Sequence, residues 1–573
     1  MSTAAAIPQS RPLSDSEVEG PVLKKPRLDK EILVEEKAAT PDALETVLKE
    51  DSEVVVPLED AQPRHGKVAK HKKKKRKEPP LPEPCSAADV LYQEIRALLG
   101  EDVVDEVTKS GGAFQPPFEY GEELVVKIEN IGSGGSGIAL APQEKGPWAV
   151  VVPFALSGET ARVRIVKSDR MHSIATPLEI LTKNAELRND SRVQCKYFGS
   201  CGGCQYQMLS GETQLNLKRD VIIRAFKIYS KLPESSVPEI GSTVESPLVY
   251  AYRTKITPHF ERPPKWAKKN EVKPGEQPPW LKIGFNMTSS NSTMDIEECP
   301  ISTPILNERY KSDRKDIIQN IFSYKKGVSL MYRDSLDPSF DAEKMMSPPI
   351  DKLSEAFTRH VCITDQKGSA REMVGDYLFE YNAGGFFQNN NSVLPLLVDY
   401  VRDLISTMEY PATSGHPTHL VDTYCGAGLF AISLASAFNK VAGIELSQSS
   451  IKSAKRNAKL NSIPDEKISF LSGEAQNIFA AVKDFPADKT VVVIDPPRKG
   501  CDDLFLKQLL QFRPSTVVYI SCNVHTQARD VGVIVRETEK DDEGRRYKLE
   551  SLRGFDLFPQ TAHVESAALL RLY

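Results

Sequence analysis

From residue 386 onward, short apolar segments alternate with amphipathic ones. The pattern predicts helices over residues 429–438 and from Ser449 onward. It predicts strands over residues 419–422, 440–444, 468–471, 491–494 and 517–520. Such alternation is the signature of a doubly wound parallel sheet, so we expect an α/β fold of the Rossmann-like kind over residues 386–573. Because open α/β sheets bind ligands at the carboxyl ends of their strands, we expect the functional residues at that edge.

Two of the predicted strands end in reactive side chains. Residues 491–494 run into Asp495-Pro496-Pro497-Arg498, and residues 517–520 lead to Ser521 and Cys522. A thiol beside an Asp-Pro-Pro turn indicates covalent chemistry on a substrate that is held next to a bound cofactor.

A glycine-bearing turn after the first predicted strand indicates a cofactor site. Residues 422–430 read Asp-Thr-Tyr-Cys-Gly-Ala-Gly-Leu-Phe, and the two glycines allow the backbone to approach a ligand closely. Glu445 ends the next strand, where a carboxylate can accept both hydroxyls of a ribose. A dinucleotide and S-adenosylmethionine both suit this pattern. The carboxylate of Asp495, fixed by two prolines, suits methyl transfer to a nucleobase and is not required for hydride transfer, so we predict S-adenosylmethionine.

Methylation of a pyrimidine at carbon 5 needs a thiol and a base in one pocket. A thiolate that adds to carbon 6 makes carbon 5 nucleophilic, and a base must then remove the carbon-5 proton. Cys522 is the predicted nucleophile. His563 and Glu565 are both candidates for the base.

Six motifs, in order along the chain, resemble those of the RNA uracil-C5 methyltransferases. They are Phe386-Phe387-Gln388, residues 422–428, Gly443-Ile444-Glu445, Asp495-Pro496-Pro497-Arg498, Ser521-Cys522-Asn523 and His563-Val564-Glu565. The resemblance implies that Cys522 is the nucleophile and Glu565 the base, and that His563 is structural. It also implies that S-adenosylmethionine is contacted by Gln388, Tyr424, Glu445 and Asp495. Val524 departs from the family, which usually has proline at this position.

A small β-barrel is predicted upstream, over residues 116–182. Short strands with glycine turns, at residues 123–128, 138–140, 148–152 and 161–166, are typical of such barrels. Residues 117–181 also resemble the RNA-binding barrel, of the OB-like or TRAM kind, that precedes the catalytic part in many family members. A short helical segment, residues 87–115 with a helix over 87–99, comes before it.

Residues 185–385 are predicted to form a mixed α+β central domain. Within it, residues 250–282 carry eight basic side chains against three acidic ones, interleaved with aromatic residues. Cations for phosphates and aromatic faces for bases indicate RNA binding, and a solvated insertion is the alternative. Five prolines between Pro263 and Pro279 predict that its middle is an exposed loop.

Four cysteines of the central domain form a candidate metal site. Cys195, Cys201 and Cys204 lie close together among glycines, and Cys299 is a candidate fourth ligand. Spacing alone allows zinc, an iron–sulfur cluster or structural thiols. The spacing resembles the [4Fe–4S] site of the ribosomal-RNA members of the family, so we expect that cluster as a second cofactor.

The N-terminal residues 1–86 are predicted to be a disordered, basic and proline-rich tail. Residues 72–77 (Lys-Lys-Lys-Lys-Arg-Lys) are typical of a nuclear-localisation or nucleic-acid-binding segment, and a solvated linker is the alternative. The N-terminus lacks the apolar core of a secretory signal. No apolar stretch approaches the roughly 18–20 residues of a membrane helix. We therefore expect a protein of the nucleus, the cytoplasm or both, with an organelle pool left open, no membrane and no obligate protein partner.

We expect the chain to methylate carbon 5 of a uridine in RNA with S-adenosylmethionine, through a covalent adduct between Cys522 and carbon 6. Family members with a long basic N-terminus mostly act on the T-loop uridine, position 54, of tRNA, so tRNA is the expected partner. Ribosomal RNA is the alternative substrate. A non-catalytic RNA-binding or RNA-folding protein and methylation of cytosine carbon 5 are the alternative functions.

Overall fold

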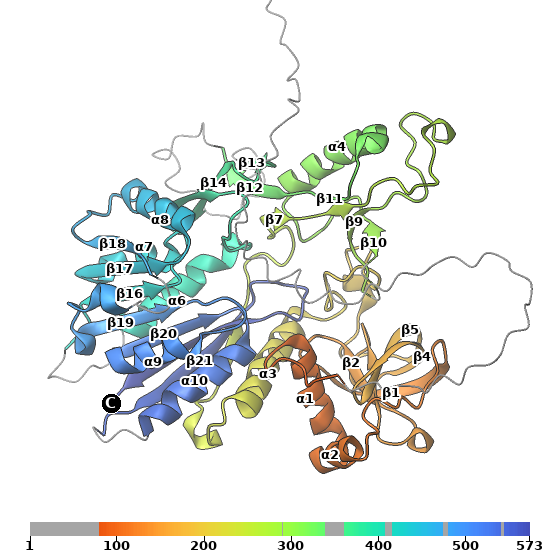
Figure 1. The fold of residues 1–573 in the computed structure, drawn as a ribbon, viewed down its shortest axis with the longest axis horizontal. Helices are drawn as coiled ribbons and strands as arrows, with labels where there is room; N and C mark the ends of the chain where they lie inside the picture. Colours follow the sequence, from red (N-terminus) through yellow and green to blue (C-terminus); the bar gives the residue numbers. More distant parts are fainter. Residues whose placement is uncertain are drawn as a thin grey trace, which may run out of the picture. The chain divides into compact units, whose positions relative to one another are not determined.

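The computed structural model describes residues 79–288, 290, 292–337, 360–406, 415–473, 479–539 and 544–573. Its largest element is an eight-stranded sheet (Figure 1). In spatial order the strands are β18 (Ile468–Ser472), β17 (Lys440–Glu445), β16 (His419–Thr423), β19 (Thr490–Ile494), β20 (Thr516–Ser521), β22 (Glu565–Leu572), β21 (Tyr547–Phe555) and β6 (Gly241–Val244). The first five run parallel, which confirms the sequence prediction. Since β22 is antiparallel to both β20 and β21, the sheet as a whole is mixed.

Helices cover both faces of this sheet because alternate residues of each strand point to opposite sides. Val491 and Val493 of β19 join one apolar core, whereas Val492 and Ile494 join the other. The helices of the first core are α6 (Leu394–Ser406), α7 (Leu429–Ser433) and α8 (Gln448–Leu460). Those of the second core are α3 (Gly211–Tyr229), α9 (Asp503–Phe512) and α10 (Val524–Glu539).

The sheet and its helices differ from the sequence prediction in two places. The helix predicted over residues 429–438 ends at Ser433, because the chain tightens into a 3-10 turn, Ala435–Ala437, before the buried Phe438. The strand β6 and the helix α3 come from the segment predicted as a central domain. Since β6 pairs in parallel with β21, the catalytic sheet extends across the predicted boundary at residue 385.

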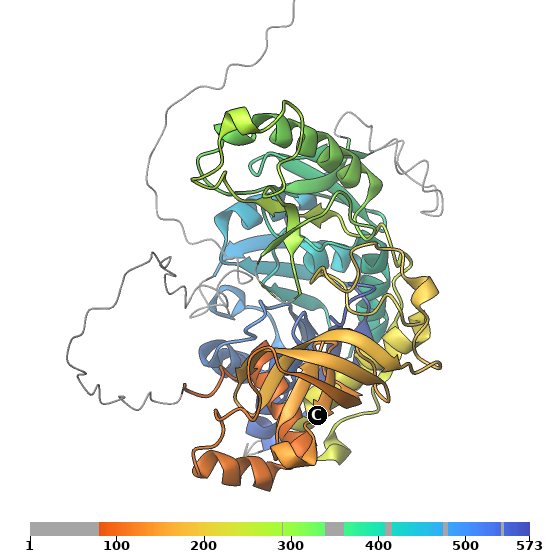
Figure 2. The same cartoon turned by 90° about the vertical axis from the view of Figure 1, so that its right-hand side faces the viewer.

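The predicted barrel is present as five strands that close on themselves. They are β1 (Glu123–Ile131), β2 (Gly137–Leu140), β3 (Ala149–Val152), β4 (Thr160–Asp169) and β5 (His172–Thr182). Figure 2 shows the barrel, in orange, with α1 (Ala87–Leu99) and α2 (Glu101–Lys109) beside it. The backbone N–H of Ser133, in the turn before β2, donates a hydrogen bond of 2.9 Å to Glu94 Oε1 of α1. The helix predicted over residues 87–99 is confirmed.

The central part consists of α4 (Pro304–Asn320) and short antiparallel strands. One sheet contains β10 (Thr293–Asp295), β9 (Ile283–Asn286), β8 (His259–Phe260) and β11 (Val328–Ser329). Another contains β13 (His360–Ile363), β12 (Tyr332–Leu336) and β7 (Lys255–Ile256), and β14 (Ser369–Val374) forms a hairpin with β15 (Tyr377–Asn382). The Trp266 side chain is 68% exposed, as the prediction of an exposed loop in this part requires.

Residues 79–86, predicted as the end of a disordered tail, are ordered. Cys85 is buried, and Arg170 Nη2 donates a hydrogen bond of 2.6 Å to the Pro79 carbonyl. The rest of that tail, with the basic run at residues 72–77, lies outside the described residues. Among the helices that the structure describes, none is long and apolar enough to cross a membrane.

Candidate active site

Three neighbouring strands deliver the predicted catalytic residues to one edge of the sheet. Asp495 follows β19, Cys522 follows β20, and Glu565 begins β22. The antiparallel register pairs Ser521 with Ser566, so the next step along the two strands sets Cys522 opposite Glu565. The structure therefore brings the predicted nucleophile and the predicted base together.

The Cys522 thiol lies half-buried beside two carboxyl groups. Burial raises its pKa to about 12, and the nearby Glu565 and Asp495 act in the same direction. The guanidinium of Arg498 opposes them and lowers this pKa. At neutral pH the thiol is therefore protonated, and it must lose its proton before it can act as a nucleophile.

Glu565 is only 3% exposed. Burial raises its pKa to about 8, with a further contribution from the charge of Asp495, while Arg498 again opposes the shift. Burial also raises the pKa of Asp495, to about 7. A carboxylate with a pKa close to neutral is a far better proton acceptor than an ordinary glutamate, which suits Glu565 to general-base chemistry.

His563, the other candidate base, lies next to Glu565. Its Nε2 is 3.9 Å from Glu565 Oε1, and its ring packs edge-on against Phe558 with the centroids 5.0 Å apart. Burial lowers the pKa of His563 to about 3, and the cations Arg498, Lys218 and Arg253 lower it further. Since an imidazole with so low a pKa is a weak base, the site favours Glu565 as the proton acceptor.

Arg498 is a functional candidate to which the sequence patterns gave no role. It stands at the end of the Asp-Pro-Pro turn, and its side chain is exposed. Its charge acts on Cys522, Glu565 and His563, so it is a cation that the candidate catalytic groups share with His563. Its place in the motif that contains Asp495 was the signal that could have identified it.

The loop that carries Cys522 is tied to the Asp-Pro-Pro loop. Asn523 Nδ2 and Thr526 Oγ1 donate hydrogen bonds of 2.9 Å and 3.2 Å to the Arg498 carbonyl. Thr526 Oγ1 also donates to the Asn523 carbonyl at 2.9 Å. These bonds hold the turn at Val524, where the sequence lacks the proline that is usual in the resembled family.

The carboxyl ends of β16 and β17 form the candidate cofactor site. Glu445 accepts hydrogen bonds from the backbone N–H groups of Gly426, at 3.1 Å, and Ser447, at 2.8 Å. Asp422 Oδ2 accepts a bond of 2.8 Å from the Ala431 N–H. Asp422 Oδ1 is buried and has no hydrogen-bond partner among the described residues. A buried carboxylate with an unused acceptor at this edge suits a ligand that brings its own donors.

Two further predicted cofactor residues lie in loops near this edge. Tyr424 has a left-handed backbone (φ 60°), and its ring lies 5.4 Å from that of Phe505 in α9. Gln388 is 7% exposed in the loop after β15. Among the described residues, no hydrogen bond or ion pair joins the Gln388 side chain to another site residue. The structure thus groups Asp422, Glu445 and Asp495, but it does not tie Gln388 to them.

The four predicted metal-binding cysteines share one region of the central part. The pKa of Cys204 is raised to about 12, mainly by burial. The charges of the other three thiols contribute to this shift, so these thiols lie near Cys204. Burial likewise raises the pKa of Cys299, to about 11. Among the residues that the structure describes, however, no three His, Cys, Asp or Glu side chains are grouped so that they could hold a metal ion.

The fold is that of a methyltransferase of the Rossmann-like class, and the carboxyl edge of its sheet brings a thiol and a carboxyl group together. Residues 369–572 match the family described as tRNA (Uracil-5-)-methyltransferase. Together with a relative that is 40% identical over 89% of this chain, this match shows that the chain belongs to the family.

Two curated relatives cover most of the chain. The tRNA (uracil(54)-C(5))-methyltransferase of Schizosaccharomyces pombe is 40% identical over 512 residues, which are 89% of this chain and 87% of the relative. The protein of the same name from Saccharomyces cerevisiae is 36% identical over 564 residues, 90% of this chain and 85% of the relative.

A solved structure supports the fold. The Pyrococcus abyssi tRNA (uracil-54, C5)-methyltransferase, in complex with S-adenosyl-L-homocysteine, matches with a TM-score of 0.53 at 21% identity. The match covers 78% of this chain and 100% of that one.

Proposed function

We propose that this protein methylates carbon 5 of the T-loop uridine, position 54, of tRNA, with S-adenosylmethionine as the methyl donor. The observation that carries the proposal is the placement of Cys522 opposite Glu565, beside Asp495, at the carboxyl edge of the sheet. The names of the two yeast relatives support the choice of tRNA and of this uridine.

The residues at the ends of β16, β17 and β19 would hold S-adenosylmethionine. Glu445, already oriented by two backbone N–H groups, would accept the ribose hydroxyls, and Asp422 Oδ1 offers a buried acceptor without a partner among the described residues. Asp495, Tyr424 and Gln388 are the further proposed contacts. When bound, S-adenosylmethionine supplies an electrophilic methyl group to carbon 5.

The catalytic residues act in a defined order. Cys522 gives its proton to water and adds through Sγ to carbon 6 of the uracil, which shifts electrons to the ring and makes carbon 5 nucleophilic. After carbon 5 is methylated, Glu565 removes its proton. The electrons of the broken C–H bond restore the double bond between carbons 5 and 6 and expel the Cys522 thiolate. The neighbouring Arg498 favours the anionic forms of both groups.

The barrel and an exposed loop of the central part support RNA binding. The five-stranded barrel and the loop with the exposed Trp266 would contact the folded RNA, and the target uridine would be unstacked into the site.

The basic run at residues 72–77 supports entry into the nucleus, so we propose a nuclear and cytoplasmic protein.

A [4Fe–4S] cluster at the four cysteines is a further proposal. It is supported by the spacing of Cys195, Cys201, Cys204 and Cys299 and by the charges of the other three thiols, which act on Cys204. The described side chains themselves are not grouped closely enough to hold a metal ion. No catalytic step depends on it. Iron and sulfide analysis of protein purified without oxygen tests it, with the Cys299→Ser variant as the control; protein without iron contradicts it.

Transfer of a labelled methyl group tests the proposed function. Purified protein should place 5-methyluridine at position 54 of a tRNA transcript, and a transcript with cytidine at that position should stay unmodified. Methylation of ribosomal-RNA fragments but not of tRNA would favour the ribosomal alternative. No transfer to either RNA would favour a non-catalytic RNA-binding protein, against which the intact Cys522 and Glu565 argue.

A further inference from the structure

The loop that leads into Glu565 is unusual because it is almost entirely buried. Residues 556–564 connect β21 to β22, and of these only Phe558 and His563 are more than slightly exposed. Connecting loops normally lie on the surface, since a buried loop must find partners for its backbone polar groups within the protein. The partners of this loop therefore decide where His563 and Glu565 stand.

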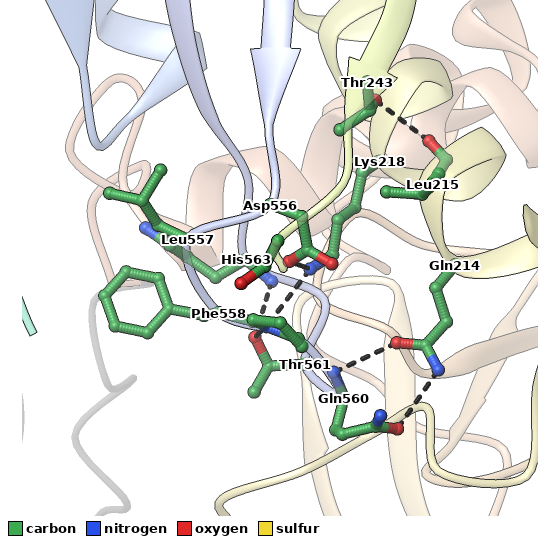
Figure 3. A network of polar contacts seen from close by, with 12 residues as sticks. Gln214, Leu215, Lys218, Thr243, Asp556, Leu557, Phe558, Gln560, Thr561 and His563 are labelled. Carbon is green, nitrogen blue, oxygen red and sulfur yellow. Dashed lines mark hydrogen bonds and ion pairs between the residues drawn. The ribbon is translucent and has the colours of Figure 1, made fainter. Parts of the chain in front are cut away.

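The main contact of the loop is a pair of hydrogen bonds between two buried residues, Gln214 of α3 and Gln560 of the loop. Gln560 N–H donates to Gln214 Oε1 at 3.0 Å, and Gln214 Nε2 donates to Gln560 Oε1 at 3.1 Å. Figure 3 shows the Gln214 amide facing Gln560, with one contact to the Gln560 backbone and one to its side chain. Both residues are 5% exposed, and Gln214 Nε2 also reaches the Tyr206 carbonyl at 3.2 Å. Helix α3, which carries Gln214, is thus fastened to the loop by a reciprocal contact.

The backbone of Gln560 is held in a conformation that favours glycine. Its φ is 70°, in the left-handed region that side chains other than glycine seldom adopt. Its carbonyl accepts hydrogen bonds from the N–H groups of Gln205, at 3.0 Å, and Tyr206, at 2.9 Å. A strained residue persists only where its surroundings enforce it, and such positions cluster at functional sites.

Further contacts fasten both ends of the loop. Lys218 of α3 is fully buried, forms an ion pair with Asp556, and donates a hydrogen bond of 3.0 Å to the Phe558 carbonyl. At the other end, the Ala562 N–H donates to Gln205 Oε1 at 3.2 Å. Since Gln205 directly follows Cys204, this bond also joins the segment that carries the cysteines to the loop 556–564.

The nucleophile is held by a different set of contacts. Asn523 and Thr526 tie the Cys522 loop to the Arg498 carbonyl, and neither bond involves residues 556–564. Weakening the loop before Glu565 would therefore loosen the start of β22 and the Glu565 side chain, while the Cys522 loop stays tied to Arg498.

We propose that Gln214 and Gln560 are positioning residues that hold Glu565 for removal of the carbon-5 proton. This role rests on the proposed function, because it concerns the step in which that proton moves to Glu565 and the bond between Cys522 Sγ and carbon 6 breaks. Without the amide pair, the enzyme should still form the covalent methylated adduct but should release it slowly.

The test compares formation and release of the adduct in Gln214→Leu and Gln560→Gly. The leucine removes both amide contacts at similar volume. The glycine removes one amide but accepts the left-handed φ without strain, so this variant keeps the proposal testable if Gln214→Leu fails to fold. Asn461→Leu is the matched control, because Asn461 makes a similar reciprocal contact with the Leu378 backbone, at 2.8 Å and 2.9 Å, outside the loop.

Adduct is measured as labelled RNA that stays bound to protein on a denaturing gel, and release as free methylated RNA. We expect adduct formation within about twofold of wild type and release slower by up to about 10²-fold, as displacement of a catalytic group by about 1 Å can cause. Equal slowing of both steps, or no change beyond that in Asn461→Leu, would overturn the positioning role.

Glu565→Gln separates this inference from the proposed function. If Glu565→Gln forms no adduct, the proposed function fails, and the positioning role fails with it. If Glu565→Gln traps adduct while Gln214→Leu and Gln560→Gly release it like Asn461→Leu, only the positioning role is lost.

Discussion

Cys522 and Glu565 lie opposite each other at the ends of two neighbouring antiparallel strands, one step beyond the pair formed by Ser521 and Ser566. The pairing of β20 with β22 thus sets the spacing of the two backbones, while the orientation of the Glu565 side chain depends also on the loop that precedes it. Because the half-buried thiol and the buried carboxyl group lie close to each other and to Asp495, each holds its proton more tightly than it would in water.

Proton removal should become faster between pH 7 and pH 9. Glu565 accepts the carbon-5 proton only in its anionic form, and its pKa is raised to about 8. The anion of Glu565 is the minor form below pH 8 and the major form above it. Release of the adduct should therefore become about tenfold faster between pH 7 and pH 9. Release of preformed adduct in pH-jump experiments measures this directly. A flat profile would contradict the assignment of Glu565 as the base.

Asp495→Asn should make the Cys522 thiol more reactive although it removes a proposed cofactor contact. The charge of Asp495 raises the pKa of Cys522, so its loss should lower that pKa. If the pKa of the thiol falls by about one, the thiolate fraction at neutral pH rises about tenfold. Alkylation of the Cys522 peptide by iodoacetamide, followed by mass spectrometry, gives the rate. Arg498→Gln is the matched opposite, since loss of the cation should slow alkylation; the same direction in both variants would contradict this electrostatic account.

Glu445→Gln should weaken the binding of S-adenosylmethionine. The substitution removes the charge that strengthens hydrogen bonds to a ribose, and charge-assisted bonds contribute about 1.5–3 kcal/mol. Calorimetry should therefore show affinity reduced by about tenfold or more. Glu466→Gln, at an exposed position shortly before β18, is the control and should bind normally. Unchanged affinity in Glu445→Gln would contradict the placement of the cofactor ribose at the end of β17.

Lys218→Met should destabilise the protein strongly. The substitution leaves Asp556 buried without its partner, and breaking one side of a buried ion pair costs about 3–5 kcal/mol. The double variant Lys218→Met/Asp556→Leu should recover much of this loss, since apolar replacements of buried pairs are often tolerated. Urea unfolding measures both. Arg309→Ala, which breaks an exposed pair with Asp313, should change the free energy of unfolding by no more than about 1 kcal/mol.

The sequence predicted the parallel strands and the positions of the candidate catalytic residues for related reasons. Buried parallel strands appear as short apolar runs, and the reactive side chains follow those runs directly, as with Asp495 after β19 and Cys522 after β20. The sequence did not predict β22, the strand that makes the sheet mixed. This strand is buried along its whole length and shows no alternation of polar and apolar residues.

The supports of the site could not be predicted in the same way. Gln214 and Gln560 are 346 positions apart, and Lys218 and Asp556 are 338 apart. Nothing local in either segment marks the contact, because it exists only after α3 has packed on the sheet. The acidity of Glu565 and Cys522 depends equally on the folded neighbourhood, in which Arg498 and Asp495 act on both.

The covalent adduct between Cys522 and the target uridine tests the central claim most directly. Glu565→Gln is mixed with S-adenosylmethionine labelled in the methyl group and with a tRNA transcript, and the products are separated on a denaturing gel. We expect labelled RNA bound to protein, a bond at Cys522 by mass spectrometry, and no bound RNA in Cys522→Ala/Glu565→Gln. Methylation by Cys522→Ala, or an adduct that persists without Cys522, would contradict the mechanism.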